Sequence, residues 1–140
     1  MAAAVACLLP LFAPVSTRAV VSDVHLVDGP SADAIDVADA AMSEDGSGGI
    51  VYLRRVDGRA HVFAAQFSDG AWRPPQRVDV GQTFDSSWPR IGAGDGGRLV
   101  VTWVQEFGIE SDRLFSATLD PGARGFQTPV PVDCNVGEAT

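Results

Sequence analysis

The chain has 140 residues, of which 46% are hydrophobic and 20% are charged, a composition typical of one globular domain and not of a disordered, collagen-like or coiled-coil protein. Its 10 basic and 18 acidic residues give a net charge of −8, so the chain lacks the basic surface that a nucleic-acid partner requires. Every basic residue is an arginine, which excludes mechanisms that need a lysine, such as Schiff-base formation.

Residues 1–19 have the pattern of a secretory signal peptide. Ala2–Val15 carries no charge. It is shorter than the roughly 20 residues that a membrane-spanning helix needs. Thr17 and Ala19 are small residues of the kind that precede a cleavage site, although basic residues before the apolar run are missing. We therefore expect cleavage after Ala19, secretion and no membrane span, with a buried N-terminal helix as the alternative.

Residues 20–38 are expected to form an outer strand and a linker. The apolar residues of Val20–Asp28 predict a strand that precedes the first repeat. In Ser31–Met42, by contrast, Asp33, Asp36 and Asp39 recur at every third position with little large apolar surface opposite them. This spacing favours a loop for most of that segment.

A repeat of about fifty residues organises the rest of the chain. Met42 and Ile50 align with Ile91 and Leu99, in both cases 49 positions apart. Later apolar runs align at spacings of 52 and 54, because extra residues enter between the runs, where loops tolerate insertions. We place the first repeat at 39–87 and the second at 88–133.

Each repeat contains four short apolar or alternating runs separated by turn-forming residues, which predicts four antiparallel β-strands per repeat. The second strand of each repeat is apolar at successive positions, so we expect both faces of each sheet to be covered. The predicted strands are Asp39–Ser43, Gly49–Arg55, Ala60–Phe67, Trp72–Val80, Trp88–Ala93, Arg98–Gln105, Asp112–Leu119 and Phe126–Val132.

The last seven residues, 134–140, read as the start of a further repeat and contain Cys134. If Cys7 leaves with the signal peptide, Cys134 is the one cysteine of the mature chain. A single cysteine in an oxidising compartment usually has a partner. Two interpretations stay open: a disulfide partner outside this chain, or a free buried thiol.

The turn after the third strand of the first repeat carries a recognisable order of residues. Ser68, Asp69, Gly70 and Trp72 follow the Ser/Thr, Asp, Gly, aromatic order of the Asp-box. With the four-stranded repeat, they make the chain resemble the sialidase-like, BNR-type β-propeller repeat proteins over residues 20–133. The resemblance implies a structural turn, in which Asp69 bonds backbone amides and Trp72 packs between neighbouring blades.

We therefore predict an all-β fold of two four-stranded antiparallel blades of a β-propeller. Propellers close with about 4 to 8 blades, so two blades form an incomplete ring. Either the chain is a fragment of a longer propeller, which we favour, or it is complete and self-associates to cover its exposed faces.

The resemblance also implies a possible activity, that of a sialidase-like glycoside hydrolase. That family uses three arginines, a Tyr–Glu pair and an aspartic acid, whereas this chain offers Arg90 on a first strand and its one tyrosine, Tyr52, on a second strand. His25 and His61 lack a neighbouring ligand at metal-binding spacing. We expect no catalytic residue, no cofactor and no metal site within this chain.

Binding is the remaining function. The connections Gly81–Trp88 and Gln105–Glu110 lie at the same end of the predicted sheets, and their aromatic and acidic groups suit a glycan or a protein ligand. The alternative is that the aromatic residues pack between blades. We predict a non-catalytic binding or scaffold module, with the hydrolase as the alternative and a structural cell-surface repeat as a third possibility. The candidate ligand-binding residues are Phe84, Asp85, Trp88, Arg90, Glu106 and Phe107.

Overall fold

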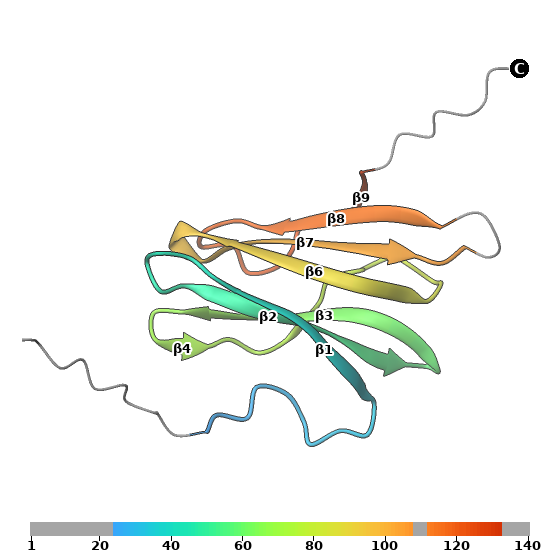
Figure 1. Ribbon diagram of the computed structural model, residues 1–140, viewed down its shortest axis with the longest axis horizontal. Helices are drawn as coiled ribbons and strands as arrows, with labels where there is room; N and C mark the ends of the chain where they lie inside the picture. Colours follow the sequence, from blue (N-terminus) through green and yellow to red (C-terminus); the bar gives the residue numbers. More distant parts are fainter. Residues whose placement is uncertain (1–23, 108–111, 133–140) are drawn as a thin grey trace, which may run out of the picture.

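The computed structural model describes residues 24–107 and 112–132 and forms them into two antiparallel sheets (Figure 1). The first sheet has the order β1 (Ala34–Met42), β2 (Gly48–Val56), β3 (Arg59–Ser68), β4 (Ala71–Trp72), and β5 (Gln76–Arg77) also pairs with β3. The second has the order β6 (Ser86–Gly94), β7 (Arg98–Gln105), β8 (Arg113–Leu119), β9 (Val130–Pro131), with the 3-10 turn η1 (Asp95–Gly97) between β6 and β7. The predicted all-β fold of antiparallel four-stranded units is confirmed.

The two sheets lie face to face, and each strand pairs only within its own sheet (Figure 1). The sheets do not close on themselves, which is consistent with an incomplete propeller. No α-helix occurs in residues 24–107 and 112–132, and accordingly no helix in these ranges is long and apolar enough to cross a membrane.

Backbone hydrogen bonds repeat between the two sheets at the spacings that the sequence predicts. In each sheet, two backbone carbonyls of the third strand, β3 or β8, accept isolated hydrogen bonds from the segment that follows the next turn. One donor N–H lies near each end of that segment. The chain thus returns along the third strand in the same way in both repeats. The matching bonds are Arg73 N to Gln66 O, Val78 N to Val62 O and Gln127 N to Thr118 O, each 2.8 Å, and Val132 N to Leu114 O, 2.9 Å.

The prediction of a loop over most of Ser31–Met42 is wrong, because β1 already begins at Ala34. The register of β1 against β2 shifts twice, between Ala34 and Asp36 and between Val37 and Asp39. Each such bulge inserts a residue and interrupts the alternation of a regular strand. The apolar and acidic residues of β1 therefore did not show the period of two that identifies a strand in sequence.

The fourth strands are shorter than predicted. Of Trp72–Val80, only Trp72 and Gln76–Arg77 pair in the sheet, and of Phe126–Val132 only Val130–Pro131 pairs. Pro74 and Pro75 interrupt the first of these segments, and a proline has no N–H to donate to the neighbouring strand.

The N-terminal strand is not observed in its described part, since Val24–Asp28 forms no strand. The signal peptide, Cys7, residues 20–23, Gly108–Ser111 and residues 133–140 with Cys134 lie outside the described residues.

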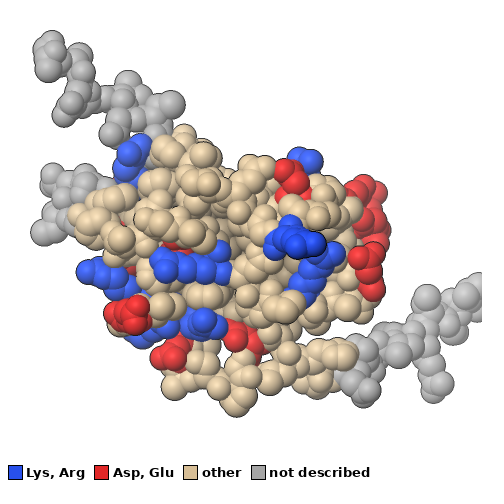
Figure 2. Space-filling view, turned by 180° about the vertical axis from the view of Figure 1, so that it is seen from behind, with Lys and Arg blue, Asp and Glu red and all other residues tan. Residues whose placement is uncertain are grey.

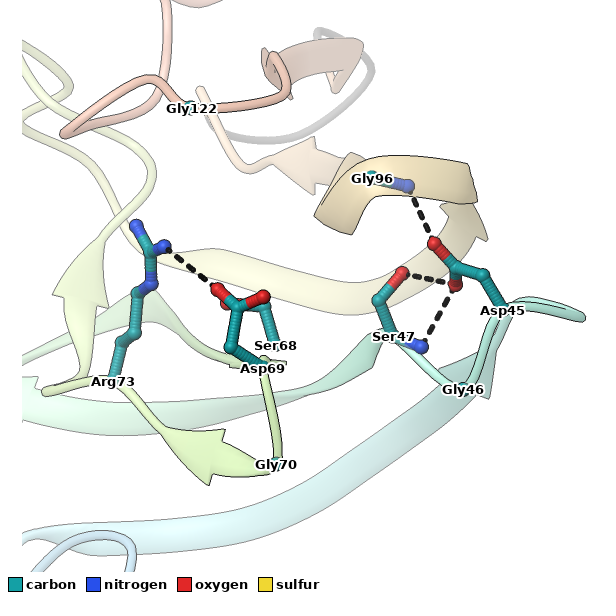
Figure 3. Close-up of a pocket in the computed structure, with 9 residues that line it drawn as sticks. All are labelled: Asp45, Gly46, Ser47, Ser68, Asp69, Gly70, Arg73, Gly96 and Gly122. Carbon is teal, nitrogen blue, oxygen red and sulfur yellow. Dashed lines mark hydrogen bonds and ion pairs between the residues drawn. The ribbon is translucent and has the colours of Figure 1, made fainter.

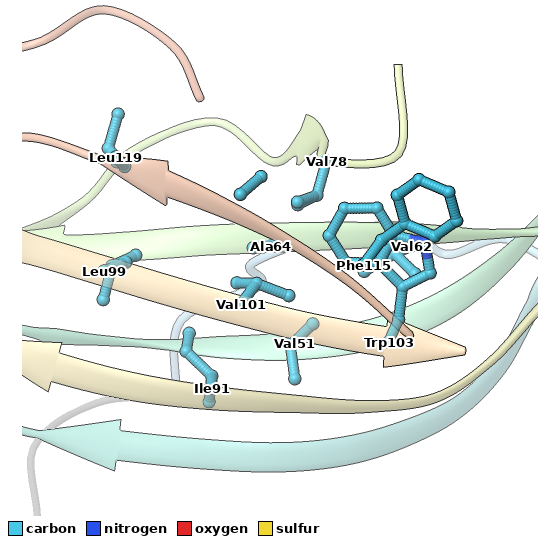
Figure 4. Packing of buried hydrophobic residues seen from close by; sticks show 11 residues of the cluster. Val51, Val62, Ala64, Val78, Ile91, Leu99, Val101, Trp103, Phe115 and Leu119 are labelled. Carbon is cyan, nitrogen blue, oxygen red and sulfur yellow. The ribbon is translucent and has the colours of Figure 1, made fainter. Parts of the chain in front are cut away.

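The hydrophobic core lies between the two sheets (Figure 4). Side chains from β2 and β3 meet side chains from β6, β7 and β8, and Gly49 permits close approach, since a Cβ there would lie 3.0 Å from Leu99 Cδ1. The two large rings of the core, Trp103 and Phe115, are stacked with centroids 6.1 Å apart. The buried cluster comprises Val51, Val62, Ala64, Val78, Ile91, Leu99, Val101, Trp103, Phe115, Ala117 and Leu119.

The outer faces of the two sheets differ in how far they are covered by other parts of the chain. On the first sheet, Tyr52 and Phe63 point away from the second sheet and are nevertheless buried, with the segment after residue 24 on their side. On the second sheet, the residues of β7 alternate between buried and more exposed positions. The expectation that both faces of each sheet are covered is therefore correct for β2 but wrong for β7, which has no layer over its outer face in the described residues.

Asp28 attaches the N-terminal segment to the first sheet. It accepts a hydrogen bond from the Tyr52 hydroxyl and pairs with Arg54, whose Nη1 lies 3.2 Å from Asp28 Oδ2. The Tyr52 bond is the main cause that holds the pKa of Asp28 below its ordinary value of 3.8. Burial, followed by the bond to Asp28, raises the pKa of Tyr52 well above its ordinary value.

We expect Tyr52→Phe to lower the free energy of unfolding by about 1 kcal/mol at pH 7, because it removes a hydrogen bond to a charged group at a partly exposed site. Asp28 has a lowered folded-state pKa, so its contribution is complete above pH 3.8 and is lost as the pH falls through the folded-state pKa. The difference between wild type and variant should therefore shrink in acid. Urea unfolding of wild type and variant at pH 7 and below pH 3 measures the difference in unfolding free energy. An equal difference at the two pH values would contradict a hydrogen bond from Tyr52 to ionised Asp28.

Candidate functional site

Five of the six predicted site residues, all except Arg90, lie at one end of the molecule, here called the loop end. It is formed by the β2–β3 turn at Asp57 and Gly58, by the connection 79–85 between the sheets, and by the connection that follows β7. The ends of β6, β7 and β8 meet there, since Ser86 pairs with Gln105 and Gln105 with Arg113. The two connections singled out by sequence are therefore brought together as predicted.

Phe84 and Phe107 contact each other. Their ring centroids are 5.0 Å apart, and Phe107 is also 6.3 Å from Phe115 at the margin of the core. Asp85 accepts a hydrogen bond from Ala60 N at 2.7 Å and lies 3.6 Å from Arg59. Because these three candidates have partners from both sheets, they join the two sheets, which is the packing alternative that the sequence left open.

Trp88 has a different environment. Its side chain is 77% exposed, and its backbone has a φ of 54°, in the left-handed region that bulky residues rarely adopt. The register of β6 against β7 shifts between Ser87 and Arg90, so Trp88 lies in a bulge. A bulge re-aims a side chain, and here it presents the indole to solvent.

A shallow hollow of about 470 Å³ lies beside Trp88. Its lining includes Trp88, Glu106 and Asp112, so residues with an aromatic ring and with hydrogen-bond acceptors lie around one hollow. The lining residues among those described are Ser87, Trp88, Val104, Glu106 and Asp112. Trp88 and Glu106 are thus the two predicted site residues that share one hollow, and Asp112 joins them.

Arg90 does not line this hollow. It lies on β6 opposite Thr102, and its Nη1 donates to Pro89 O at 3.1 Å. The structure therefore divides the six candidates into three sets: Phe84, Asp85 and Phe107 between the sheets, Trp88 and Glu106 at the hollow, and Arg90 alone on the outer face.

A buried polar cluster at the loop end was not predicted. The Asp79 carboxylate is fully buried and accepts hydrogen bonds from Arg77 Nε at 2.8 Å and Ser86 Oγ at 2.6 Å. His61 Nδ1 lies 2.9 Å from Asp79 Oδ2 and also 2.9 Å from Arg77 Nη2. Gln105 lies 3.3 Å from the Ser86 hydroxyl. The one sequence signal was that a Val–Asp pair recurs at 78–79 and 132–133, and no local pattern pointed to His61, which lies 18 residues from Asp79 in the chain.

These residue types also occur in Ser-His-Asp hydrolases, but the arrangement differs. In such a triad the histidine lies between serine and aspartate, so that it can take the hydroxyl proton. Here the carboxylate of Asp79 lies between Ser86 and His61 and binds both. The cluster therefore ties β3, the connection between the sheets and β6 together, and it does not form a nucleophile with its base.

The opposite end of the molecule, the turn end, contains the residues of the Asp-box resemblance (Figure 3). A pocket of about 320 Å³ lies there. Asp45 accepts hydrogen bonds from Ser47 N at 2.8 Å and from Gly96 N at 2.6 Å, so it links the turns of the two sheets. The Ser47 hydroxyl bond to Asp45 is the main cause that lowers the pKa of Asp45.

The Asp-box residues themselves are placed as follows. Ser68 and Gly70 line the turn-end pocket, and the Asp69 carboxylate is almost fully exposed, 4.0 Å from Arg73 (Figure 3). Trp72 packs edge-on against Phe67 on the outer face of the first sheet, with centroids 5.4 Å apart. In this pocket, then, Asp45 fills the amide-bonding role that the resemblance implied for Asp69.

The charges do not form a large basic surface on the face shown in Figure 2, where arginines are spread across the middle and acidic residues gather at one edge. Among the described residues, no group of three or more His, Cys, Asp or Glu side chains is placed to hold a metal ion.

No family of known proteins and no curated protein matches the chain. Function is therefore inferred from the geometry of the loop end.

Proposed function

We propose that this chain is a secreted, non-catalytic binding module of a sialidase-like β-propeller, which takes an uncharged glycan in the hollow beside Trp88. The observation that carries the proposal is the exposed indole in a strained backbone conformation. Left-handed φ values in residues other than glycine cost of order 1–3 kcal/mol and concentrate at ligand sites. Residue 88 has this conformation and also presents the largest side chain of the hollow to solvent.

Glu106 and Asp112 define the chemistry of the ligand. Carboxylates accept hydrogen bonds from hydroxyl groups, and a sugar offers several hydroxyls around an apolar ring face that can lie on an indole. Two carboxylates in a chain of net charge −8 repel an anionic ligand. An uncharged glycan is therefore favoured over a sialylated one.

The hydrolase alternative has less support. A sialoside substrate needs cationic groups that converge on its carboxylate, and the cationic candidate, Arg90, lies on the outer face of β6 outside the hollow and donates to a backbone carbonyl. The buried serine, histidine and aspartate of the Asp79 cluster are not arranged for nucleophilic attack. Binding without turnover is the function that these groups can perform.

The test is binding of the purified chain to an array of neutral and sialylated glycans, followed by titration with the neutral glycan that binds best. Trp88→Ala should raise Kd at least tenfold, because it removes the stacking surface, whereas Trp88→Phe should retain most of the affinity. Trp72→Ala serves as the matched control at the turn end and should leave Kd unchanged, with circular dichroism verifying the fold of each variant.

Two results would overturn the proposal: absence of glycan binding by the wild type, or equal affinity of wild type and Trp88→Ala. Turnover of a sialoside that is abolished by Arg90→Ala in a folded protein would favour the hydrolase instead.

A further inference from the structure

The outer face of the second sheet, here called the back face, is uncovered in the described structure and carries large apolar side chains beside the polar Thr102, Ser116 and Thr118. It is formed by alternate residues of β7 and β8 and by the segment of β9, all of which point away from the first sheet. Its large apolar members are Val100, Leu114, Val130 and Val132, which are 38% to 56% exposed.

The repeat shows what such a face normally contacts. Val100, Leu114 and Val132 occupy the same repeat positions as Val51, Val62 and Val78 of the first sheet, at the spacings of 49, 52 and 54. Those three residues of the first sheet are fully buried against the second sheet. At these three positions the back face therefore repeats, in apolar character and register, a surface that already packs on another sheet of this kind, whereas Leu53 and Ala64 of that surface correspond to Thr102 and Ser116.

The outer face of the first sheet, here called the front face, completes the comparison. Its central residues Ile50, Tyr52 and Phe63 occupy the repeat positions of Leu99, Val101 and Phe115, which form the second sheet's side of the core. The N-terminal segment at Asp28 covers part of the front face, but Val37 and Met42 on β1 remain exposed.

We propose that a second copy of this chain covers the back face and that copies associate head to tail, the back face of one on the front face of the next. This contact continues the established packing of the first sheet on the second, because each outer face carries residues equivalent to those already in that interface. Two, three or four copies would give four, six or eight blades, which is the range in which propeller rings close.

The experiment measures the molar mass of the purified chain by light scattering and sedimentation. The wild type should have two, three or four times the mass of the 14.7 kDa chain. Val100→Asp places a charge on the back face and Val37→Asp places one on the front face, and each variant alone should be monomeric. Val80→Asp is the matched control, since Val80 is exposed in the connection between the sheets and lies on neither face.

Mixing distinguishes head-to-tail contact from symmetric contact. Val37→Asp retains an intact back face and Val100→Asp an intact front face, so an equimolar mixture should form a dimer although neither variant dimerises alone. Back-to-back association would leave Val37→Asp dimeric by itself, and front-to-front association would leave Val100→Asp dimeric. Either result overturns the proposal, as does a monomeric wild type at all concentrations or a Val80→Asp variant that also dissociates.

The inference does not rest on the proposed glycan site, although the two adjoin, since Val104 lines the hollow and pairs with Leu114 of the back face. Val100 is four residues along β7 from Val104, the residue of that strand that lines the hollow, a distance of about 13 Å at the usual rise of a strand. Val100→Asp should therefore leave glycan binding intact while it abolishes assembly. Trp88→Ala should do the reverse, so failure of one proposal can be told from failure of the other.

Discussion

Asp79→Ala should lower the free energy of unfolding by about 3 kcal/mol, among the largest effects of any single substitution in this chain. Removing one partner of a buried ion pair costs about 3–5 kcal/mol, because the remaining charge is left unpaired. The lower end of this range applies to Asp79→Ala, because the Arg77 side chain is 31% exposed and keeps some contact with water. The Ser86 hydroxyl would also lose its acceptor, and His61 Nδ1 would lose its contact with the carboxylate.

Urea unfolding at fixed protein concentration measures this effect, since any association would make the apparent stability depend on concentration. Asp79→Asn keeps the shape and an acceptor oxygen, so it should cost less than alanine. Asp36→Ala, at an exposed position of β1, is the matched control and should change stability by no more than about 0.5 kcal/mol. A cost below 1 kcal/mol for Asp79→Ala would show that the cluster does not hold the loop end together.

The regular strands could be predicted because they depend on the local pattern of apolar and polar residues and on the fifty-residue repeat. β7 begins and ends at the predicted residues, Arg98 and Gln105, and the spacing of the repeat reappears in the backbone bonds of both sheets. β1 could not be located from its pattern, because its two bulges break the alternation. Prolines shortened the fourth strands, an effect that residue type alone does indicate.

The sequence could predict that most of the candidate residues gather at the loop end, but not which side chains contact one another there. Sequence patterns predicted that the connections with Phe84 and Phe107 lie at the same end of the sheets. Whether the two rings face solvent or each other depends on how the two sheets stack. The left-handed conformation of Trp88 has no local signal, since tryptophan rarely adopts it. Asp79 has a local partner in Arg77, but its partners His61 and Ser86 lie on β3 and β6, so its role in joining the two sheets follows from the tertiary structure.

Trp103→Ala should lower the free energy of unfolding by about 3–5 kcal/mol, the usual cost of removing a large buried ring. Trp103 is fully buried between the sheets and stacks on Phe115. Its repeat equivalent is Arg54, whose guanidinium lies 4.0 Å from the centroid of the Phe63 ring. The same pair of positions thus contains a core aromatic pair in one sheet and a cation–π pair at the partly exposed front face of the other.

That equivalence provides the control for Trp103. Arg54→Ala removes a contact worth about 0.5–1 kcal/mol at a partly exposed site, together with the ion pair to Asp28. Trp103→Phe should cost less than Trp103→Ala, because it retains a ring and removes an indole N–H that is buried without a hydrogen-bond partner in the described structure. If urea unfolding gives equal losses for Trp103→Ala and Arg54→Ala, the space between the two sheets is not the core that stabilises this fold.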